Sequence, residues 1–342
     1  MTPGTRRFAY AFAVIAVATV AWIAYRSYGL YFRPIVERGG VVRFPSGGTQ
    51  QQLVDTLYAR GFIRDTATLR AALERFDLGY RSGQYELRPG MTPKELVRDI
   101  KLGKQKEARV VLTHGRTLDD VARQATRFVE VDSAALHEAL LDSAWLRARD
   151  LDTGNAITVA IPNTYNVYWD ATPGQLRDRL ADEAERFWAK ADRRARADSL
   201  GLTPREVYTL ASIVESETKV DAEKPTVAGV YLNRLERGIK LDADPTVIFG
   251  IGDFGIRRVL YSHLEYDSPY NTYMYAGLPP GPIAMPSISS IDAVLAPEAH
   301  DYLFFVTKGD GSGTHAFAKN MTGHARNIRR FEENLRARGI RR

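Results

Sequence analysis

The sequence predicts an α+β protein with an N-terminal transmembrane helix, a small α+β domain and a larger mixed α+β domain. Three observations predict this organisation. An uncharged apolar stretch lies near the N-terminus, strand-like runs followed by Gly-x-Thr recur over the first third, and helical patterns followed by turn-rich aromatic segments make up the rest. A chain of 342 residues is long enough for two soluble domains beside a terminal segment.

The first element is the apolar stretch 8–25, FAYAFAVIAVATVAWIAY, which contains no charged side chain. At about 1.5 Å per residue, a helix of this length is just long enough to cross a bilayer. Trp22 and Tyr25 lie where interfacial aromatic residues are expected, which favours an uncleaved anchor over a signal peptide with its shorter apolar region. A buried helix in a cytosolic protein is the alternative.

The charges around this stretch predict its orientation. Arg6 and Arg7 precede it, so residues 1–7 are expected in the cytoplasm and the rest of the chain outside, although Arg26 weakens the asymmetry. Residues 26–39 are expected to form a linker.

A repeated pattern follows, in which Gly, any residue and Thr precede three residues and then Leu or Val. The matching positions are Gly47, Thr49, Leu53; Gly90, Thr92, Leu96; and Gly115, Thr117, Val121. Each follows a β-rich run, so each unit predicts a strand, a glycine turn and a helix capped by Thr. Residues 40–125 are therefore expected to form a small α+β domain. Such repeats occur in carbohydrate-binding modules and in scaffolds, so they do not assign binding.

The remaining chain predicts a larger mixed domain. Residues 126–200 are mostly helical in pattern, and ITVAIPNTYNVYW alternates like a strand whose aromatic residues either line a cleft or pack. Two helices follow from Leu202, then turn-rich segments, a hairpin containing strand 302–307 and a basic C-terminal helix. Long loops rich in Pro, Gly, Asn and Tyr usually belong to a functional site.

Composition excludes several kinds of chemistry. The chain has no cysteine, which excludes disulfides, thiolate nucleophiles and Cys-ligated metals. No Gly-x-Ser-x-Gly elbow, P-loop or dinucleotide fingerprint is present. The six histidines form no close ligand pair: His114, His137, His263, His300, His315 and His324. Carboxylate chemistry remains, and glycoside cleavage is its commonest setting. The net charge of +6 fits an anionic partner, whether nucleic acid, phospholipid or acidic polymer.

The strongest candidate carboxylate is Glu217. The capping box Thr203-Pro-Arg-Glu206 predicts a helix start, and Glu217 follows Val214 by three residues, so it continues an apolar stripe. Glu215 lies about 160° away around the helix, so the two carboxylates are not expected in one small cleft. Lost hydration raises a carboxyl pKa, which suits a general acid. The alternative is a helix that frays near Ser216 and leaves Glu217 solvated or capping.

Three stretches of the chain resemble the endolytic murein transglycosylases of the MltG, or YceG-like, family. They are LASIVESETKVDAEKPTVAGVYLNRLERGIKLDADPTVIFG, YNTYMYAGLPPGPIAMPS and HAFAKNMTGH. The resemblance implies a single-pass inner-membrane protein anchored by residues 8–25, with a LysM-like domain at 40–125 and a catalytic domain at 126–342 in the periplasm. It implies cleavage of nascent peptidoglycan between N-acetylmuramic acid and N-acetylglucosamine, leaving 1,6-anhydro ends. Peptidoglycan synthases are possible partners, and no cofactor, metal or nucleic acid is implied.

The resemblance also implies roles for individual residues. The family's catalytic glutamate is the second one of E-x-E-T, which is Glu217 here. As an acid it would protonate the glycosidic oxygen, and as a base it would take the proton of the muramyl 6-hydroxyl that attacks C1. Candidates that orient the sugar and stabilise positive charge are Asn233, Asp244, Thr246, Asn271 and Tyr273, with His315 and Phe317 as weaker ones. Asp244 precedes Pro245, so a plain turn residue is the alternative there.

The sequence departs from the family at two positions, with Ser216 where lysine is common and Asn163 where aspartate is usual. Two other functions stay open. One is a hydrolase in which Asp244 or Glu223 places a water, and the other is a non-catalytic scaffold that holds glycan through its Gly-x-Thr repeats.

Overall fold

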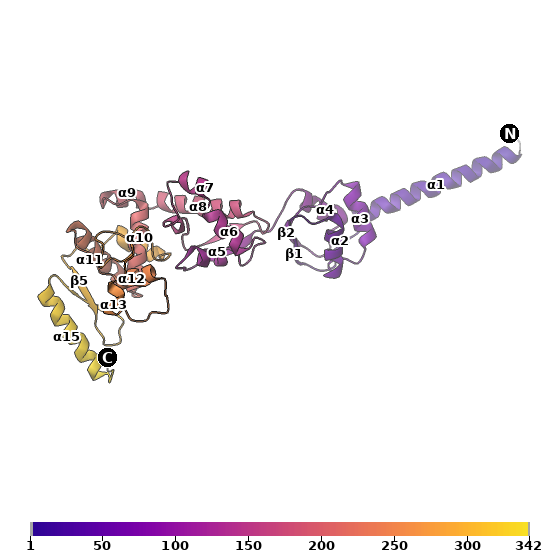
Figure 1. The fold of residues 1–342 in the computed structure, drawn as a ribbon. Coiled ribbons are helices and arrows are strands. Elements are labelled where there is room, and N and C mark those ends of the chain that lie inside the picture. Colours follow the sequence, from indigo (N-terminus) through magenta and orange to yellow (C-terminus); the bar gives the residue numbers. More distant parts are fainter. Residues whose placement is uncertain (1–2, 341–342) are drawn as a thin grey trace. The chain divides into compact units, whose positions relative to one another are not determined.

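The computed structural model describes residues 3–340 and has a mixed α+β fold, which confirms the predicted class (Figure 1). The chain divides into two compact units. Unit 1 extends to Arg109 and includes Phe128–Glu130 and Asn166–Ala171, whereas unit 2 comprises Val110–Arg127, Val131–Tyr165 and the chain from Thr172 onward. Residues 1–2 of the expected cytoplasmic segment and residues 341–342 of the expected catalytic domain lie outside the described part.

Helix α1, Pro3–Tyr31, contains the predicted membrane span. Its segment Phe8–Tyr31 has a mean hydropathy of 2.0, is not buried within the protein and is long enough to cross a membrane. The helix continues past Arg26, whose guanidinium lies 5.1 Å from the ring centroid of Trp22. The first part of the segment expected to be a linker is therefore helical.

Unit 1 has one antiparallel strand pair, β1 (Gly40–Phe44) with β2 (Gly83–Leu87), in which Val42 faces Tyr85. Its helices are α2 (Gln50–Ala59), α3 (Thr66–Arg75) and α4 (Pro93–Lys101). Their apolar faces and the strands form one core, which includes Val42, Phe44, Leu53, Leu57, Leu69 and Leu96.

The three Gly-x-Thr segments fold largely as predicted. Thr49, Thr92 and Thr117 each form a capping box at the start of α2, α4 and α5 (Leu118–Thr126). Gly47 and Gly90 adopt left-handed φ values of 72° and 83°. The third segment differs, because α5 belongs to unit 2 and Gly115 forms a bridge with Met285. The assignment of residues 40–125 to a LysM-like domain stays a prediction.

The first part of unit 2 is mostly helical, as predicted, with α6 (Ser133–Leu140), α7 (Ser143–Arg147), α8 (Pro173–Ala189) and α9 (Arg193–Ser199). The stretch predicted as one strand forms a short 3-10 helix, Ala156–Val159, and then strand β4, Asn163–Val167. Pro162 separates them, and proline has no amide hydrogen for a strand ladder. Tyr165 of this stretch packs in the core and is fully buried.

The C-terminal half carries the elements around Glu217. They are α10 (Pro204–Glu217), a 3-10 turn (Asp221–Glu223), α11 (Lys224–Glu236), α12 (Asp244–Ile251), α13 (Tyr261–Leu264), α14 (Ile288–Leu295) and α15 (Met321–Ala337). The predicted hairpin is present, with β5 (Phe304–Thr307) antiparallel to β6 (His315–Ala318). The remaining strand, β3 (Ala108–Leu112), pairs with β4.

Candidate active site

Helix α10 packs against α9, α11, α12 and α14 and ends at the candidate acid. Thr203 and Glu206 form the predicted capping box, and every residue from Val207 to Val214 is buried. Ser212, which the helical wheel places opposite the apolar arc, is buried too; it donates to the carbonyl of Thr209 at 2.6 Å and accepts from the amide of Ile283 at 3.0 Å. The helix does not fray at Ser216 but continues to Glu217.

Glu217 opens into a cavity of about 420 Å³. The cavity has polar walls from α11, α12 and the segment before it, and an apolar wall from the β5–β6 hairpin. Its lining residues are Glu217, Tyr231, Arg234, Leu241, Asp242, Asp244, Tyr273, Phe304, Phe305, Val306, Thr307, His315, Met321 and His324.

The surroundings of Glu217 raise the proton affinity of its carboxyl. Burial is the main cause and raises the pKa of this carboxyl to about 7, with a smaller contribution from the negative charge of Asp244. The Tyr231 hydroxyl, which donates to Oε1 at 2.9 Å, and the Arg234 guanidinium act in the opposite direction. A carboxyl with this pKa is present in both protonation states near pH 7, as an acid–base catalyst requires.

A second carboxylate, Asp244, faces the same cavity from the start of α12. Its Oδ1 accepts a hydrogen bond of 2.7 Å from the hydroxyl of Tyr273. Burial and this bond raise the pKa of Tyr273, so its hydroxyl remains a donor. Asp244 is the first residue of α12, where the helix dipole stabilises a negative charge, so it is not simply a turn residue before Pro245.

Arg234 supplies a fixed positive charge at the cavity. Its side chain is only 9% exposed and forms an ion pair of 2.9 Å with Asp242. It also donates to the carbonyls of Leu303, Lys240 and Leu241 at 2.7, 2.9 and 3.0 Å. These bonds join α11 to the segments on either side of the cavity.

The histidines of the cavity are held by neighbours. His315 contacts Glu223 through its backbone amide at 2.8 Å and through Nδ1 at 2.9 Å. His324 stacks on Phe304 with a centroid distance of 5.2 Å, and burial lowers its pKa. Within residues 3–340, no group of three or more His, Cys, Asp or Glu side chains is placed to hold a metal ion.

The structure brings together some of the predicted site residues. Glu217, Asp244, Tyr273 and His315 line one cavity, whereas Glu215 lies outside it, as the helical wheel predicts. Phe317 does not line the cavity and packs against Tyr302 and Phe305.

The three other predicted residues do not line the cavity but hold backbone around it. The amide of Asn233 donates to the carbonyls of His300 and Tyr302 at 2.8 and 3.0 Å. The side-chain amide of Asn271 donates to the backbone carbonyls of Leu264 and Tyr266 at 2.9 and 2.8 Å. Thr246 is fully buried and bonds to the carbonyl of Ala243 at 2.7 Å.

Sequence reasoning missed Tyr231 and Arg234, the two polar residues of α11 that reach the cavity. They are three residues apart and therefore share a helix face, whereas Asn233 is about 200° from Tyr231 around the same helix. A helical wheel of α11 would have separated the face of Tyr231 and Arg234 from that of Asn233.

Comparison with known proteins identifies the family of this chain. A model of the YceG-like family matches residues 42–330. The chain belongs to the YceG-like family. The matched range includes most of both units and all the cavity residues named above.

Individual relatives are similar to this YceG-like chain over part of their length. It is 43% identical over 119 residues to the endolytic murein transglycosylase of Bacillus subtilis (strain 168), covering 35% of this chain and 32% of that protein. It is 25% identical over 325 residues to the endolytic murein transglycosylase of Streptococcus pneumoniae serotype 2 (strain D39 / NCTC 7466), covering 84% of this chain. The match spans 57% of the pneumococcal protein, so this chain covers little more than half of that relative.

A solved structure has the same fold. The crystal structure of the yceG-like protein lmo1499 from Listeria monocytogenes matches with a TM-score of 0.57 at 25% identity. The match covers 84% of this chain and 98% of that chain.

Proposed function

We propose that this chain is a lytic transglycosylase that cleaves the bond between N-acetylmuramic acid and N-acetylglucosamine in nascent peptidoglycan strands and leaves 1,6-anhydro ends. The observation that carries the proposal is Glu217, whose pKa is raised to about 7 at the wall of the cavity. The family and the two relatives named endolytic murein transglycosylase support the same reaction.

In the proposed reaction, Glu217 acts twice. Its protonated carboxyl gives a proton to the glycosidic oxygen as the bond from C1 of the muramyl residue to this oxygen breaks. The carboxylate then takes the proton of the muramyl 6-hydroxyl, whose oxygen forms the new bond to C1. The proton balance closes without water, and Glu217 is protonated again for the next cycle.

The neighbours of Glu217 suit this double role. Tyr231 occupies Oε1 as a donor, so the proton of the neutral carboxyl is expected on Oε2, free for the glycosidic oxygen. The carboxylate of Asp244, oriented by Tyr273, is proposed to stabilise the positive charge that develops at C1. The rings of Phe304 and Phe305 limit the access of water, which would otherwise compete with the 6-hydroxyl.

The remaining predicted residues are assigned a supporting role. We propose that Asn233, Thr246 and Asn271 shape the substrate site by fixing the backbone around it, since their polar groups are bonded to carbonyls. His315, held by Glu223, is proposed to border the bound sugar.

Membrane attachment follows from α1. We propose that residues 8–25 anchor the chain in the inner membrane, with the N-terminus in the cytoplasm and both units in the periplasm. The length and apolar character of the helix support this. Residues 40–125 are proposed to act as a LysM-like module, and peptidoglycan synthases are proposed as partners because they make the strands.

Product analysis tests this function. The full chain is incubated in detergent with purified glycan strands, and the new ends are identified by mass spectrometry. A transglycosylase gives an anhydro end that is one water lighter than the reducing end a hydrolase gives. Glu217→Gln should abolish cleavage. Reducing ends would instead favour a hydrolase in which Asp244 places the water, and wild-type protein that binds strands without cutting them would favour a scaffold.

A further inference from the structure

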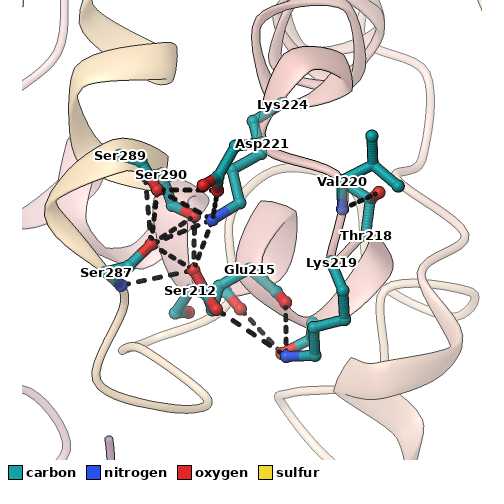
Figure 2. A network of polar contacts seen from close by, with 11 residues as sticks. Ser212, Glu215, Thr218, Lys219, Val220, Asp221, Lys224, Ser287, Ser289 and Ser290 are labelled. Atoms are coloured by element: carbon teal, nitrogen blue, oxygen red, sulfur yellow. Dashed lines mark hydrogen bonds and ion pairs between the residues drawn. The ribbon is translucent and has the colours of Figure 1, made fainter. Parts of the chain in front are cut away.

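A polar cluster centred on the buried Lys224 and Ser290 joins the end of α10 to the starts of α11 and α14, away from the cavity that Glu217 lines. Figure 2 shows its side chains pointing toward one another; they are Glu215, Asp221, Lys224, Ser287, Ser289 and Ser290. We propose that the Glu215–Lys224 ion pair is a positioning device that holds the Glu217 carboxyl against Tyr231. The kinetic consequence of this inference rests on the proposed function, but its structural claim can be measured without turnover.

Glu215 is the centre of the cluster. Its Oε2 accepts hydrogen bonds from Lys224 Nζ at 3.0 Å, from Ser290 Oγ at 2.6 Å and from Ser287 Oγ. Burial raises the pKa of this carboxyl, but these bonds outweigh it and lower the pKa to about 2. Glu215 therefore stays charged over the pH range in which Glu217 titrates.

Lys224 is the partner that holds the starts of α11 and α14 against the end of α10. Its side chain is only 4% exposed, and Nζ contacts Glu215, Asp221, Ser287 and Ser289 at distances of 3.0, 2.7, 3.0 and 2.9 Å. Because Nζ is buried, this pair differs from mobile ion pairs on the surface, which contribute little. Each charge also has a second, more exposed partner, since Asp221 pairs with Lys224 at 2.7 Å and Lys219 pairs with Glu215 at 3.7 Å.

Helical spacing connects this pair to the active site. Glu215 precedes Glu217 by two residues on α10, and Lys224 precedes Tyr231 by seven residues, about two turns, on the same face of α11. The two helices are thus joined twice, by the ion pair at 3.0 Å and by the Tyr231–Glu217 hydrogen bond at 2.9 Å. The carbonyls of a last helical turn lack intrahelical partners, so such a turn frays unless other contacts hold it.

A third helix, α14, also contacts the last turn of α10. Ser287 caps α14, and its backbone amide donates to Oε2 of Glu215 at 3.3 Å. Helix α14 packs against both α10 and α11. The last turn of α10 is therefore fixed against two helices, two residues before the proposed acid.

Two substitutions in the full chain test the inference. Glu215→Gln and Lys224→Met should each lower kcat roughly ten- to hundredfold, because a small misplacement of a catalytic group has this effect. KM should change little. The titration midpoint of Glu217, followed by ¹³C NMR of labelled carboxyls and assigned with Glu217→Gln, should fall in both variants. Contact with water removes the effect of burial, which is larger than the opposite effect of the Tyr231 hydrogen bond.

The midpoint separates positioning from a simple effect of charge. Loss of the negative Glu215 would by charge alone lower the midpoint of Glu217, whereas loss of the positive Lys224 would by charge alone raise it. A fall in both variants supports positioning, and shifts of opposite sign overturn it. Lys224→Arg, which keeps the charge, should restore part of kcat.

A matched control lies on the same helix. Asp292 of α14 forms an ion pair of 2.9 Å with Arg193 of α9, so Asp292→Asn removes a similar pair without touching the cluster. Asp292→Asn should leave kcat and the titration midpoint of Glu217 at their wild-type values. If Glu215→Gln and Lys224→Met lower only the melting temperature, as this control does, the inference is wrong.

The outcome also distinguishes the two proposals. If the wild type yields no anhydro ends but the midpoint falls in both variants, the positioning holds and the proposed reaction fails. If either variant does not fold, Ser290→Ala removes the 2.6 Å bond to Glu215 and the 3.1 Å bond from Ser287, keeps the ion pair, and should shift kcat and the midpoint in the same direction by a smaller factor. An unchanged kcat and midpoint in Ser290→Ala would then count against the inference.

Discussion

The hydroxyl of Tyr231 lies 2.9 Å from Oε1 of Glu217, and this hydrogen bond joins the middle of α11 to the last residue of α10. It opposes the effect of burial on Glu217, because a donor to a carboxylate stabilises the charged form. The pKa of Glu217 is therefore set by the Tyr231 hydroxyl as well as by burial.

Removing that hydroxyl should shift the pH profile. In Tyr231→Phe the pKa of Glu217 should rise above its present value of about 7, so the high-pH limb of kcat/KM for anhydro-end formation should move to higher pH. The rate at neutral pH should fall roughly tenfold, because the Glu217 carboxyl loses the hydrogen bond that orients it.

Tyr208→Phe is the matched control for this profile. Tyr208 is equally buried, and its hydroxyl donates to the carbonyl of Ala160 at 2.7 Å, away from the cavity. This variant should lose some stability and keep the wild-type profile. A Tyr231→Phe profile that coincides with that of Tyr208→Phe would show that the bond does not tune the acid.

Glu217 should also make stability depend on pH. Its pKa is about 7 in the folded chain against an ordinary value of 4.5, so the folded state retains a proton that the unfolded state releases between these values. Stability should fall as pH rises through this window. The Glu217→Gln variant lacks this titration. Its melting temperature relative to that of the wild type should therefore increase from about pH 5 to about pH 8.

Glu215 is the contrasting case for the same measurement. Its lowered pKa means that its contribution is complete above about pH 4.5 and is lost only as the pH falls toward 2. Measured in a Glu217→Gln background, which removes the titration of Glu217, the effect of Glu215→Gln on melting temperature should stay constant between about pH 5 and about pH 8. A growing difference would contradict the assigned pKa.

Tyr273→Phe should weaken the reaction through Asp244. The variant removes the 2.7 Å bond that orients the Asp244 carboxylate, and we expect kcat/KM to fall about tenfold. Tyr275→Phe removes a bond of the same length from Tyr275 to Asp267, outside the cavity, and should leave kcat/KM unchanged. Equal losses in the two variants would point to a general effect on this segment.

Gly229 of α11 should resist substitution although it lies in a helix. A Cβ there would lie 2.7 Å from Nε2 of His300 and 2.8 Å from the carbonyl of Glu298, so Gly229→Ala should destabilise the protein by about 1–3 kcal/mol. Gly174 of α8 meets only Arg177, at 3.8 Å, so Gly174→Ala should be neutral or slightly stabilising. Denaturant unfolding of both variants tests this; equal stabilities would mean that α11 and the His300 segment can move apart.

Local signals in the sequence predicted much of the fold. The starts of α2, α4, α5 and α10 were predictable because a Thr side chain and a residue three positions later satisfy the first amides of each helix without distant partners. Glu217 was predictable as the continuation of an apolar stripe. Ser212 did not follow the same logic, because α10 is enclosed on all sides and buries its polar face as well.

The partners of Glu217 depended on contacts that periodicity does not describe. Tyr231 reaches it only because the short segment after α10 returns α11 alongside, and no local pattern specifies that path. Asn233 and Asn271 are residue types suited to binding a sugar. In the structure their side-chain amides instead donate to backbone carbonyl groups, because carbonyls removed from water need hydrogen-bond partners. Asn233 on α11 and Asn271 in the turn-rich segment therefore support the site without lining the cavity.

The end of α10 at Glu217 has one more consequence. The final carbonyl groups of a helix carry a partial negative charge, and the last turn of α10 itself has no basic residue, although Lys219 just beyond it donates to the carbonyl of Glu215 at 3.2 Å. The peptide backbone thus repels a negative charge at this position and reinforces the proton affinity that burial creates. A glutamate moved to the first turn of a helix would meet the opposite field and would give up its proton more readily, even in equally dry surroundings.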